Sequence, residues 1–484
     1  MRKSLLVKTQ NGYEYLYSES FNCILLLHPV LARLFANADI VDYDSDTIDY
    51  YIRKYNFLIS KGINDSAPIS FVTRPDANEI KLKLANLRQL TFEITDNCNL
   101  NCHYCGYGSM YSNYDARTTG NMSMQKVRNI LNYMVDIWNS SFNLSFNNVI
   151  DISFYGGEPL MNIKLIQDTI TYITKLDTKN LRFTYRMTTN AVLLDLYMDF
   201  LVNKNFNLLI SIDGNKYANS YRIFKSGEQS YDKVLNNILK LREKHPSFYE
   251  NNVSFNAVLH DRNSYEDIFL FMKNVLGKTG MISELSDGGI RSDKVEEFRA
   301  MFKPIYKERE HFFNKYNTYR EYENSDNAQL RSLVHGYTGN MYKTLNSLIK
   351  PNKSIFHMPS GTCIAFYKKV FISVNGKIFP CEKIGQNYPV GYVDDNKVNL
   401  DFEKIASFYD NMYKPLLKLC KQCYHQRNCS QCVFNIYDKC KTGKLRCPTF
   451  VNKSAMINYL KMNLEYLETY PDAYKKLLET DFLY

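Results

Sequence analysis

The sequence of 484 residues lacks the long apolar runs from which membrane-spanning segments are built. It contains no stretch of 18 apolar residues, so we expect no spanning helix and no membrane partner. The basic start over residues 1–8 has an apolar run that ends at Lys8, which is too short for the core of a secretory signal peptide. These absences predict a cytoplasmic protein.

Charge of one sign is not concentrated in any part of the chain. The net charge of +10 is spread along the sequence rather than gathered in a tail, so it does not indicate a nucleic-acid partner. It does permit an acidic peptide or an acidic redox protein as a partner. The 39 Tyr and 29 Phe supply the apolar area that long disordered segments lack. At about 100–200 residues per domain, the length predicts roughly two to four domains.

Cysteine is scarce in the first 360 residues, which contain Cys23, Cys98, Cys102 and Cys105 and no other cysteine. The remaining eight of the 12 cysteines lie between Cys363 and Cys447. In a reducing cytosol such clusters are more often metal sites than disulfides. Cys23 stands alone in an apolar stretch, and we interpret it as a buried thiol.

Residues 1–85 are predicted to form a small α+β domain. Two short strands, at 4–8 and 13–17, are joined by Asn11-Gly12, which is a strong hairpin signal. Helices are expected over 29–35 and over 46–58, where apolar residues recur at helical spacing.

From residue 86 to residue 290, short β patterns alternate with helical ones. The expected strands are 89–94, 149–155, 182–188, 208–212, 253–259 and 281–285. Six strands with intervening helices predict an α/β fold, a partial (β/α)6 barrel, whose chemistry belongs at the C-terminal ends of the strands.

Three regions are expected to complete the chain. Residues 291–355 carry an apolar stripe at helical spacing, which indicates a helical bridge that packs and spaces rather than a site. Residues 356–450 are rich in cysteine and have little periodicity, as expected where metal replaces a hydrophobic core. A closing helix is expected over 452–476, within a last segment of residues 451–484.

The first cysteine cluster reads Cys98-x3-Cys102-x2-Cys105 and directly follows the first strand of the barrel. Structural zinc sites use four ligands, commonly in paired Cys-x2-Cys knuckles, whereas this loop offers three unequally spaced thiolates. Three thiolates suit a [4Fe–4S] cluster with one iron left open for another ligand. A zinc site completed by His103 is the alternative.

The spacing of these cysteines, with the aromatic Tyr104 before the last, resembles the signature of the radical SAM superfamily. The resemblance continues after the second strand, where Tyr155-Gly156-Gly157-Glu158-Pro159 is similar to the Gly-Gly-Glu motif of that family. In the family this stretch binds the amino group of S-adenosylmethionine, because glycines let the backbone approach closely and a carboxylate pairs with an ammonium. The resemblance implies that the three cysteines hold the catalytic cluster.

The third and fourth strand ends are also similar to those of the family. Asn190 follows the third strand, and the resemblance implies a contact with the ribose, although Ala191 replaces the glycine that is usual in relatives. Ser211 and Arg222 resemble the pair that holds the methionyl carboxylate, a role that suits the planar fork of arginine. An ordinary surface ion pair is the alternative for Arg222.

The later cysteines resemble the SPASM extension of peptide-maturing radical SAM enzymes, which binds two auxiliary [4Fe–4S] clusters. The resemblance assigns to an outer cluster Cys420, Cys423, Cys429 and Cys447. It assigns to an inner cluster Cys363, Cys381 and Cys432. Cys440 is either the fourth ligand of the inner cluster or spare, which would leave an iron open. The spacing Cys429-x2-Cys432 departs from the three intervening residues that are common in the family, and zinc ribbons are the alternative for the Cys-x2-Cys pairs.

The resemblance implies three [4Fe–4S] clusters and S-adenosylmethionine as cofactors. It implies reductive cleavage of S-adenosylmethionine to methionine and a deoxyadenosyl radical, which abstracts hydrogen from an unactivated C–H bond. A flavodoxin- or ferredoxin-type protein would supply the electron. Residues 1–85 are compatible with a winged-helix element that captures a leader peptide by strand addition, and a structural cap on the barrel is the alternative.

We therefore predict a radical SAM maturase that crosslinks a ribosomally synthesised precursor peptide. Anaerobic sulfatase maturation, which oxidises a Cys or Ser to formylglycine, is the second hypothesis. An iron–sulfur redox or regulatory protein that binds no substrate is the third.

Overall fold

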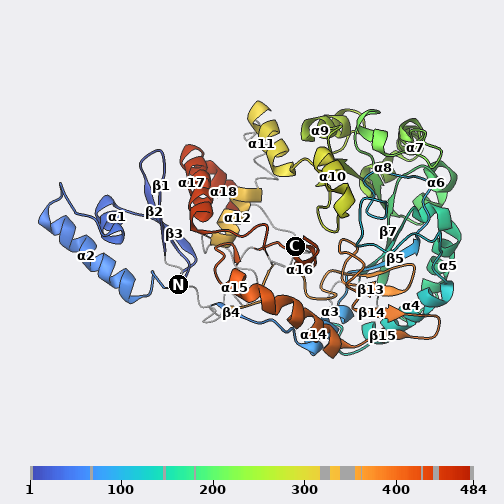
Figure 1. The fold of residues 1–484 in the computed structure, drawn as a ribbon, viewed down its shortest axis with the longest axis horizontal. Helices are drawn as coiled ribbons and strands as arrows, with labels where there is room; N and C mark the ends of the chain where they lie inside the picture. The colour runs from blue at the N-terminus through green and yellow to red at the C-terminus, as the bar shows by residue number, and fades with distance from the viewer. Residues whose placement is uncertain are drawn as a thin grey trace.

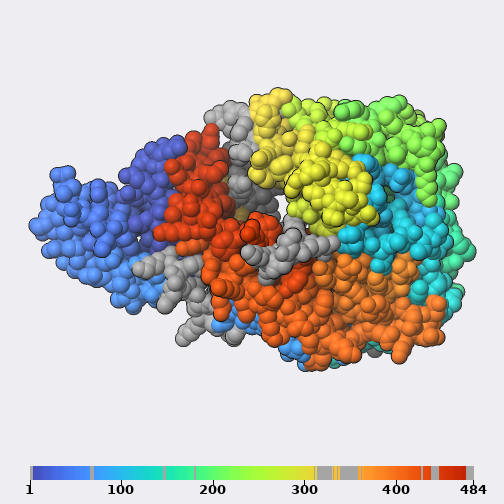
Figure 2. All heavy atoms as spheres, viewed as in Figure 1, coloured from blue at the N-terminus to red at the C-terminus, as the bar shows by residue number. Residues whose placement is uncertain are grey.

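The computed structural model describes most of the chain (Figure 1). The described residues are 4–65, 69–144, 149–178, 181–316, 328–337, 355–360, 362–426, 429–439 and 446–479. Cys440 lies outside them. Within these ranges, no helix is both long enough and apolar enough to cross a bilayer. The N-terminal residues protrude at one end of the molecule, beside the C-terminal helices (Figure 2).

The N-terminal unit is an antiparallel sheet followed by two helices. It comprises β1 (Leu5–Lys8), β2 (Glu14–Ser18), β3 (Cys23–Leu26), α1 (Pro29–Ala36) and α2 (Ser45–Ser60). The hairpin and both helices confirm the expectation from the sequence, and Gly12 takes a φ of +88° in the turn. The strand β3 was not expected; it pairs with β2, and Cys23 at its start is only partly buried rather than fully buried.

The centre of the molecule is a sheet of ten strands in the order β10-β9-β8-β7-β6-β5-β12-β13-β14-β15. The six expected strands are β5 (Gln89–Thr95), β6 (Val149–Gly156), β7 (Arg182–Thr189), β8 (Asn207–Ser211), β9 (Val253–Leu259) and β10 (Met281–Glu284). All six run parallel to their neighbours, so the α/β fold is confirmed. Six of the seven residues of β5 are buried, as expected for a parallel strand covered on both faces.

Helices follow the parallel strands and cover the sheet (Figure 1). They are α4 (Met124–Trp138), α5 (Ile163–Ile173), α6 (Leu194–Asn203), α7 (Tyr231–Lys244), α8 (Pro246–Asn252) and α9 (Tyr265–Asn274). Helix α4 shows how the sequence builds this layer. Ser123 caps its first turn by accepting a hydrogen bond from Lys126 N at 3.2 Å, and Val127, Ile130 and Leu131 bury one face against the sheet core.

The cysteine-rich region contains regular structure although its sequence shows little periodicity. Its strands are β12 (Lys369–Ile372), β13 (Lys377–Phe379), β14 (Gly391–Val393) and β15 (Val398–Leu400), and they are followed by α14 (Phe402–Tyr413). Strand β12 pairs in parallel with β5, which extends the central sheet into this region. The strands are too short to show a period, but Phe371 and Phe379 are buried in the same core as the barrel.

The remaining helices lie between and after these parts. They are α3 (Ala77–Ala85), α10 (Val295–Met301), α11 (Ile305–Tyr316), α12 (Ala328–Tyr337), α15 (Leu417–Cys420), α16 (Val433–Lys439), α17 (Lys453–Thr469) and α18 (Asp472–Glu479). The expected single closing helix is divided into α17 and α18, because Pro471 cannot continue α17. A short pairing of β4 (Ile69–Phe71) with β11 (Ile355–His357) links the N-terminal region to the end of the bridge.

Candidate active site

The C-terminal ends of the parallel strands enclose a cavity of about 300 Å³. This is the edge where barrel proteins of this kind carry their chemistry. The sequence-predicted residues that line it are Cys98, Cys102, Tyr104, Cys105, Gly156, Gly157, Glu158, Asn190, Ser211 and Arg222. Every residue predicted to bind the catalytic cluster or S-adenosylmethionine therefore borders one cavity.

The three cysteines lie in a tight loop after β5. Cys105 N donates to Cys102 O at 3.1 Å, and Leu100 N lies 3.4 Å from Cys98 Sγ. Arg117 Nη2 donates to Cys105 Sγ at 3.2 Å. Burial raises the pKa of the Cys102 thiol to about 12, so binding of a metal group here must displace protons. Three sulfur donors with a guanidinium and an amide N–H directed at them fit an anionic iron–sulfur cluster.

The position of His103 does not favour the zinc alternative. Its Nε2 lies 2.8 Å from Glu297 Oε1, and its ring stacks on Tyr221 with the ring centres 5.2 Å apart. Among the described residues, no three His, Cys, Asp or Glu side chains converge as ligands of a single metal ion. In a four-iron cluster each thiolate binds a different iron atom, so that group does not need such convergence.

The two glycines after β6 are required by the loop that leads into Cys98. Gly156 has a φ of +150°, and a Cβ there would lie 2.2 Å from Thr95 O. At Gly157 a Cβ would lie 2.1 Å from Asn97 O. Gly157 N donates to Thr95 O at 2.9 Å, and this contact holds the two strand ends together. Close approach of backbone to backbone thus explains the glycine pair in this structure, in addition to any approach to a ligand.

Glu158 joins the end of β6 to the end of β7. Its carboxylate accepts hydrogen bonds from Thr189 Oγ1 at 2.8 Å, Asn190 N at 2.8 Å and Leu160 N at 3.1 Å. Burial raises the pKa of Glu158 to about 7, and these three hydrogen bonds partly oppose the rise. Asn190 in turn donates through Nδ2 to Asn99 Oδ1 at 2.8 Å. The carboxylate therefore positions the loop of Asn190 beside the cysteine loop.

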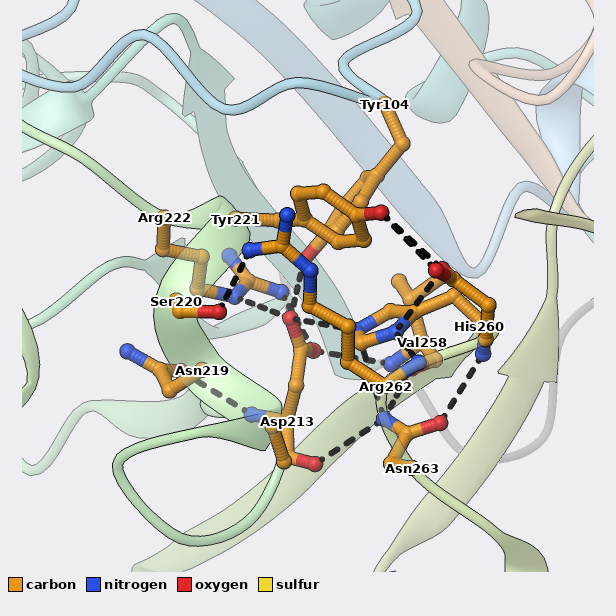
Figure 3. A network of polar contacts seen from close by, with 12 residues as sticks. Tyr104, Asp213, Asn219, Ser220, Tyr221, Arg222, Val258, His260, Arg262 and Asn263 are labelled. Carbon is orange, nitrogen blue, oxygen red and sulfur yellow. Dashed lines mark hydrogen bonds and ion pairs between the residues drawn. The ribbon is translucent and has the colours of Figure 1, made fainter. Parts of the chain in front are cut away.

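Arg222 is neither exposed nor free, because Asp213 binds it at the end of β8 (Figure 3). Its Nε lies 2.9 Å from Asp213 Oδ2 and its Nη2 lies 3.0 Å from Oδ1. The Tyr104 hydroxyl also donates to Asp213, as does Val258 N, at 2.9 Å. Burial opposes ionisation of Asp213, but Arg222 and the hydrogen bonds outweigh it and hold the pKa of Asp213 well below its usual range. The ion pair expected as an alternative thus exists, but it is buried.

Residues around Asp213 fix the neighbouring loop as well. Asn263 Nδ2 donates to Asp213 O at 3.1 Å and to Val258 O at 2.9 Å, and its Oδ1 accepts from His260 N at 2.9 Å (Figure 3). The His260 ring stacks on Tyr104 with the ring centres 5.7 Å apart. The aromatic residue of the cysteine motif is therefore held from the ends of both β8 and β9.

Sequence reasoning missed part of the cavity wall. The missed residues with polar or aromatic side chains include Tyr107, Tyr111, Tyr114, Arg117 and Glu382. Most of them follow the cysteine motif within 12 residues, and the density of tyrosine there is the signal that could have indicated them. Glu284, the last residue of β10, also borders the cavity, and its Oε2 accepts a hydrogen bond from Ile305 N at 3.1 Å.

The bridge helix α10 packs directly on the site. Phe298 and Met301 are buried in one apolar cluster with Tyr104, Tyr111 and Leu285. The expectation that the stripe of this region serves packing is confirmed, and the packing supports the cysteine loop.

The described later cysteines form two groups. One pocket is lined by Cys420, Cys423, Cys429 and Cys447. The second group is recognised through Tyr409, whose pKa is raised by burial and further by Cys432, Cys363 and Cys381. These are the two groups into which the resemblance to the SPASM extension divides the cysteines.

The sequence comparisons agree with this geometry. Residues 92–274 match the model of the Radical SAM superfamily. The "Cysteine-type anaerobic sulfatase-maturating enzyme" of Clostridium novyi is 23% identical over 76% of this chain and 91% of its own length. The "Radical SAM cyclopropyl synthase TigE" of Paramaledivibacter caminithermalis is 24% identical over 70% of this chain and 66% of its own length.

Among solved structures, a histidine-tagged anSMEcpe with bound AdoMet superposes with a TM-score of 0.53 at 18% identity, covering 82% of this chain and 96% of that chain. At this identity the likeness shows a shared fold. Together with the family match, it confirms the resemblance that the cysteine motif indicates: residues 92–274 form a Radical SAM domain.

Proposed function

We propose that the chain is a radical SAM enzyme that modifies residues of a ribosomally synthesised precursor peptide, most simply by crosslinking them. The observation that carries this proposal is the single cavity that holds the three-cysteine loop and the predicted ligand contacts, inside a Radical SAM domain. Its relatives in the comparisons include a cyclopropyl synthase and a sulfatase-maturating enzyme, and anSMEcpe has been solved with a bound Cp18Cys peptide. These relatives favour a peptide over a small metabolite as substrate.

Cys98, Cys102 and Cys105 would hold the catalytic [4Fe–4S] cluster, with S-adenosylmethionine beside it in the same cavity. When bound, these two cofactors supply the deoxyadenosyl radical that abstracts hydrogen from the substrate. The chain itself positions the reactants. Arg117 neutralises charge beside Cys105.

The contacts to S-adenosylmethionine are proposed for the strand-end residues. Backbone atoms at Gly156 and Gly157 and the nearby Glu158 would face the methionyl amino group, and Asn190 would face the ribose. Ser211 and Arg222 would take the carboxylate, through donors of Arg222 that Asp213 does not occupy. Tyr104 belongs to the cysteine loop and borders the cavity, and its hydroxyl is held by Asp213.

Two auxiliary [4Fe–4S] clusters are proposed for a SPASM domain over residues 356–450. The pocket of Cys420, Cys423, Cys429 and Cys447 supports the outer cluster. The closeness of Cys363, Cys381 and Cys432 to Tyr409 supports the inner one. Glu382 borders the catalytic cavity and directly follows Cys381 in the chain. The inner cluster would therefore lie next to the cavity that holds the substrate. Cys440 lies outside the described residues and stays a candidate fourth ligand.

The N-terminal unit, within proposed domain limits of 1–85, is proposed as a winged-helix-like element that binds the leader of the precursor. Strand β3 stands at the edge of its three-stranded sheet, where an extended peptide could add a strand. Helix α2 beside it exposes Tyr50 and Phe57. The other proposed limits are 86–290 for the barrel, 291–355 for the bridge and 451–484 for the closing helices. We further propose a cytoplasmic location and a flavodoxin- or ferredoxin-type electron donor.

Sulfatase maturation is the second candidate, because the sulfatase-maturating relative aligns over 76% of this chain. Mass spectrometry separates the two. Crosslinking removes two hydrogen atoms from the precursor and leaves all its heavy atoms, whereas formylglycine formation from cysteine replaces the sulfur by an oxygen atom from water. Oxidation of serine to formylglycine also removes only two hydrogen atoms, and labelling of the product aldehyde with a hydrazide distinguishes it from a crosslink.

The first test is anaerobic reconstitution of the whole chain with iron and sulfide, followed by reduction with dithionite in the presence of S-adenosylmethionine. We expect deoxyadenosine and methionine, and about twelve iron atoms per chain for three four-iron clusters. Absence of deoxyadenosine would exclude the enzyme and leave the redox or regulatory protein. About four iron atoms with bound zinc would exclude the auxiliary clusters.

A further inference from the structure

Tyr413 is a fully buried tyrosine at the end of α14. Its exposed fraction is 0%, and within the described residues its hydroxyl makes no hydrogen bond of acceptable geometry. Native proteins leave few buried polar groups unpaired, because each costs about 1–3 kcal/mol. An unpaired phenol in the centre of a well-packed region therefore points to an acceptor that the polypeptide does not supply.

Thr362 is a polar neighbour of Tyr413, and its hydroxyl opposes the rise in the pKa of Tyr413, but it offers no acceptor for the Tyr413 proton. Its Oγ1 lies 2.6 Å from Ser360 Oγ and accepts a hydrogen bond from Val433 N at 2.7 Å. Tyr409, one turn earlier on α14, has its ring centre 5.8 Å from that of Tyr413. The Tyr409 hydroxyl is directed at a carbonyl, Cys363 O, at 3.5 Å.

The groups that face Tyr413 electrostatically are cysteines of the proposed inner cluster. Burial raises the pKa of Tyr413, and Cys432 and Cys363 raise it further. Lys369 and Glu382, the charged side chains beside Cys381, pair with each other at 2.9 Å. The charged groups that act on the Tyr413 hydroxyl are therefore cysteine sulfurs.

We propose that Tyr413 donates a hydrogen bond to a sulfur atom of the inner [4Fe–4S] cluster and thereby raises the reduction potential of that cluster. This inference rests on the proposed assignment of Cys363, Cys381 and Cys432 to one cluster. Reduction adds negative charge to the cluster sulfurs, and a donor aimed at them stabilises the reduced state more than the oxidised state. Tyr413 is a positioning and tuning residue and does not touch substrate.

The test is a redox titration of the reconstituted whole chain, followed by electron paramagnetic resonance. The Cys381→Ala protein identifies the signal of the inner cluster by its loss. In the Tyr413→Phe protein we expect the iron content to stay near that of wild type and the midpoint potential of the inner signal to become more negative. The signal of the catalytic cluster should keep its potential.

Tyr437→Phe is the matched control, because its hydroxyl donates to a backbone carbonyl, Met412 O, at 3.0 Å. An inner signal in Tyr413→Phe with full iron and an unshifted potential overturns the inference, and so does an equal shift in Tyr437→Phe. If the Tyr413→Phe protein loses iron, double-resonance spectra of wild type in H2O and D2O decide. A coupling from an exchangeable proton at the inner cluster supports the hydrogen bond, and its absence overturns it.

Failure of the cluster assignment gives a different result. A wild-type chain with about eight iron atoms and no signal that depends on Cys381 would contradict the proposed inner cluster itself. A wild-type chain with that signal, unchanged by Tyr413→Phe, would leave the proposed function intact and contradict only the role of Tyr413.

Discussion

Arg222, which borders the cavity, and the buried Asp213 form a two-pronged ion pair with N–O distances of 2.9 and 3.0 Å. The carboxylate of this pair also receives the Tyr104 hydroxyl. Tyr104 lies between the second and third cysteines of the motif, so the ion pair and the cysteine loop form one hydrogen-bonded unit. A change at Asp213 should therefore be felt both in stability and in the geometry around the cluster.

Asp213→Asn leaves the Arg222 charge buried without a counter-charge. Loss of one partner of a buried pair costs about 3–5 kcal/mol, so we expect the Tm to fall by roughly 10 °C, measured by anaerobic scanning calorimetry. We also expect a higher KM for S-adenosylmethionine, because Arg222 loses its counter-charge and Tyr104 its charged hydrogen-bond acceptor. Tyr104→Phe, which removes one hydroxyl and keeps the ion pair, is the control and should cost about 1 kcal/mol. Equal losses in the two variants would contradict the role of the ion pair.

Glu158 predicts a pH dependence of ligand binding. Its carboxyl is protonated below a pKa of about 7 and then cannot accept all three hydrogen bonds, two of which come from the β7 end and one from Leu160 N. We therefore expect the affinity for S-adenosylmethionine to rise with pH through about 7, measured by anaerobic equilibrium binding between pH 6 and 8.5. In Glu158→Gln the rise of affinity with pH should be absent. At high pH its affinity should be roughly tenfold lower than that of wild type, which is equivalent to the loss of one hydrogen bond to a charged group.

The same carboxyl affects stability with a definite sign. Because burial raises the folded-state pKa above the unfolded value of 4.5, the native state binds the extra proton between about pH 4.5 and 7. The protonated form is the stable one, so stability is lost as pH rises through about 7. Wild type should lose more of its Tm than Glu158→Gln over this interval. In the binding experiment, a titration of the ligand's own groups would appear in both wild type and Glu158→Gln, so it can be distinguished from the titration of Glu158.

The sequence predicted the barrel and the cavity residues well, for a physical reason. Short strand patterns that alternate with helical ones indicate parallel strands, and the C-terminal ends of parallel strands meet at one edge of the sheet. Residues at the ends of two neighbouring strands, such as Glu158 and Asn190, therefore lie close together. What the sequence could not indicate is that Glu158 would be engaged by Thr189 and Asn190 rather than left free.

The extension of the sheet by β12 was not predictable from its own residues. Strand β12 has four residues, too few to show a period of two, and its pairing with β5 joins positions that are 280 residues apart, as in Lys369↔Gln89. The partner of Arg222 was equally hidden, although Asp213 stands at a strand end, because nothing local in the sequence distinguishes a buried ion pair from an exposed one.

Ala191 stands where the resembled family motif has a glycine, and its backbone conformation gives a testable prediction. It is fully buried with a φ of +59°, a left-handed conformation that costs a residue with a Cβ about 1–2 kcal/mol. Glycine would take this conformation without that cost. We expect Ala191→Gly to raise the Tm by a few degrees, less the small loss of buried methyl contact. Ala218→Gly, at a buried position with no left-handed strain, is the control and should lower it.

Glu468 on α17 connects the N-terminal hairpin to the rest of the molecule. Its two oxygens accept hydrogen bonds from the Tyr15 hydroxyl at 2.9 Å and from Asn11 Nδ2 at 2.7 Å. Glu468→Ala removes both, so we expect the hairpin to loosen by about 1–2 kcal/mol, measured as faster hydrogen–deuterium exchange over residues 4–18. Met462→Ala, at an exposed position of the same helix, is the control and should leave that exchange unchanged.

The same variant separates the role of the N-terminal unit from that of the barrel. A loosened hairpin should weaken binding of a leader peptide, whereas deoxyadenosine formation with dithionite and no peptide depends on the barrel and should keep its rate. A fall in deoxyadenosine formation that parallels the fall in peptide binding would mean that the hairpin supports the barrel as a structural cap. Unchanged binding with faster exchange would mean that the leader is recognised elsewhere, because the strand to which it would add sits in the sheet that this contact holds.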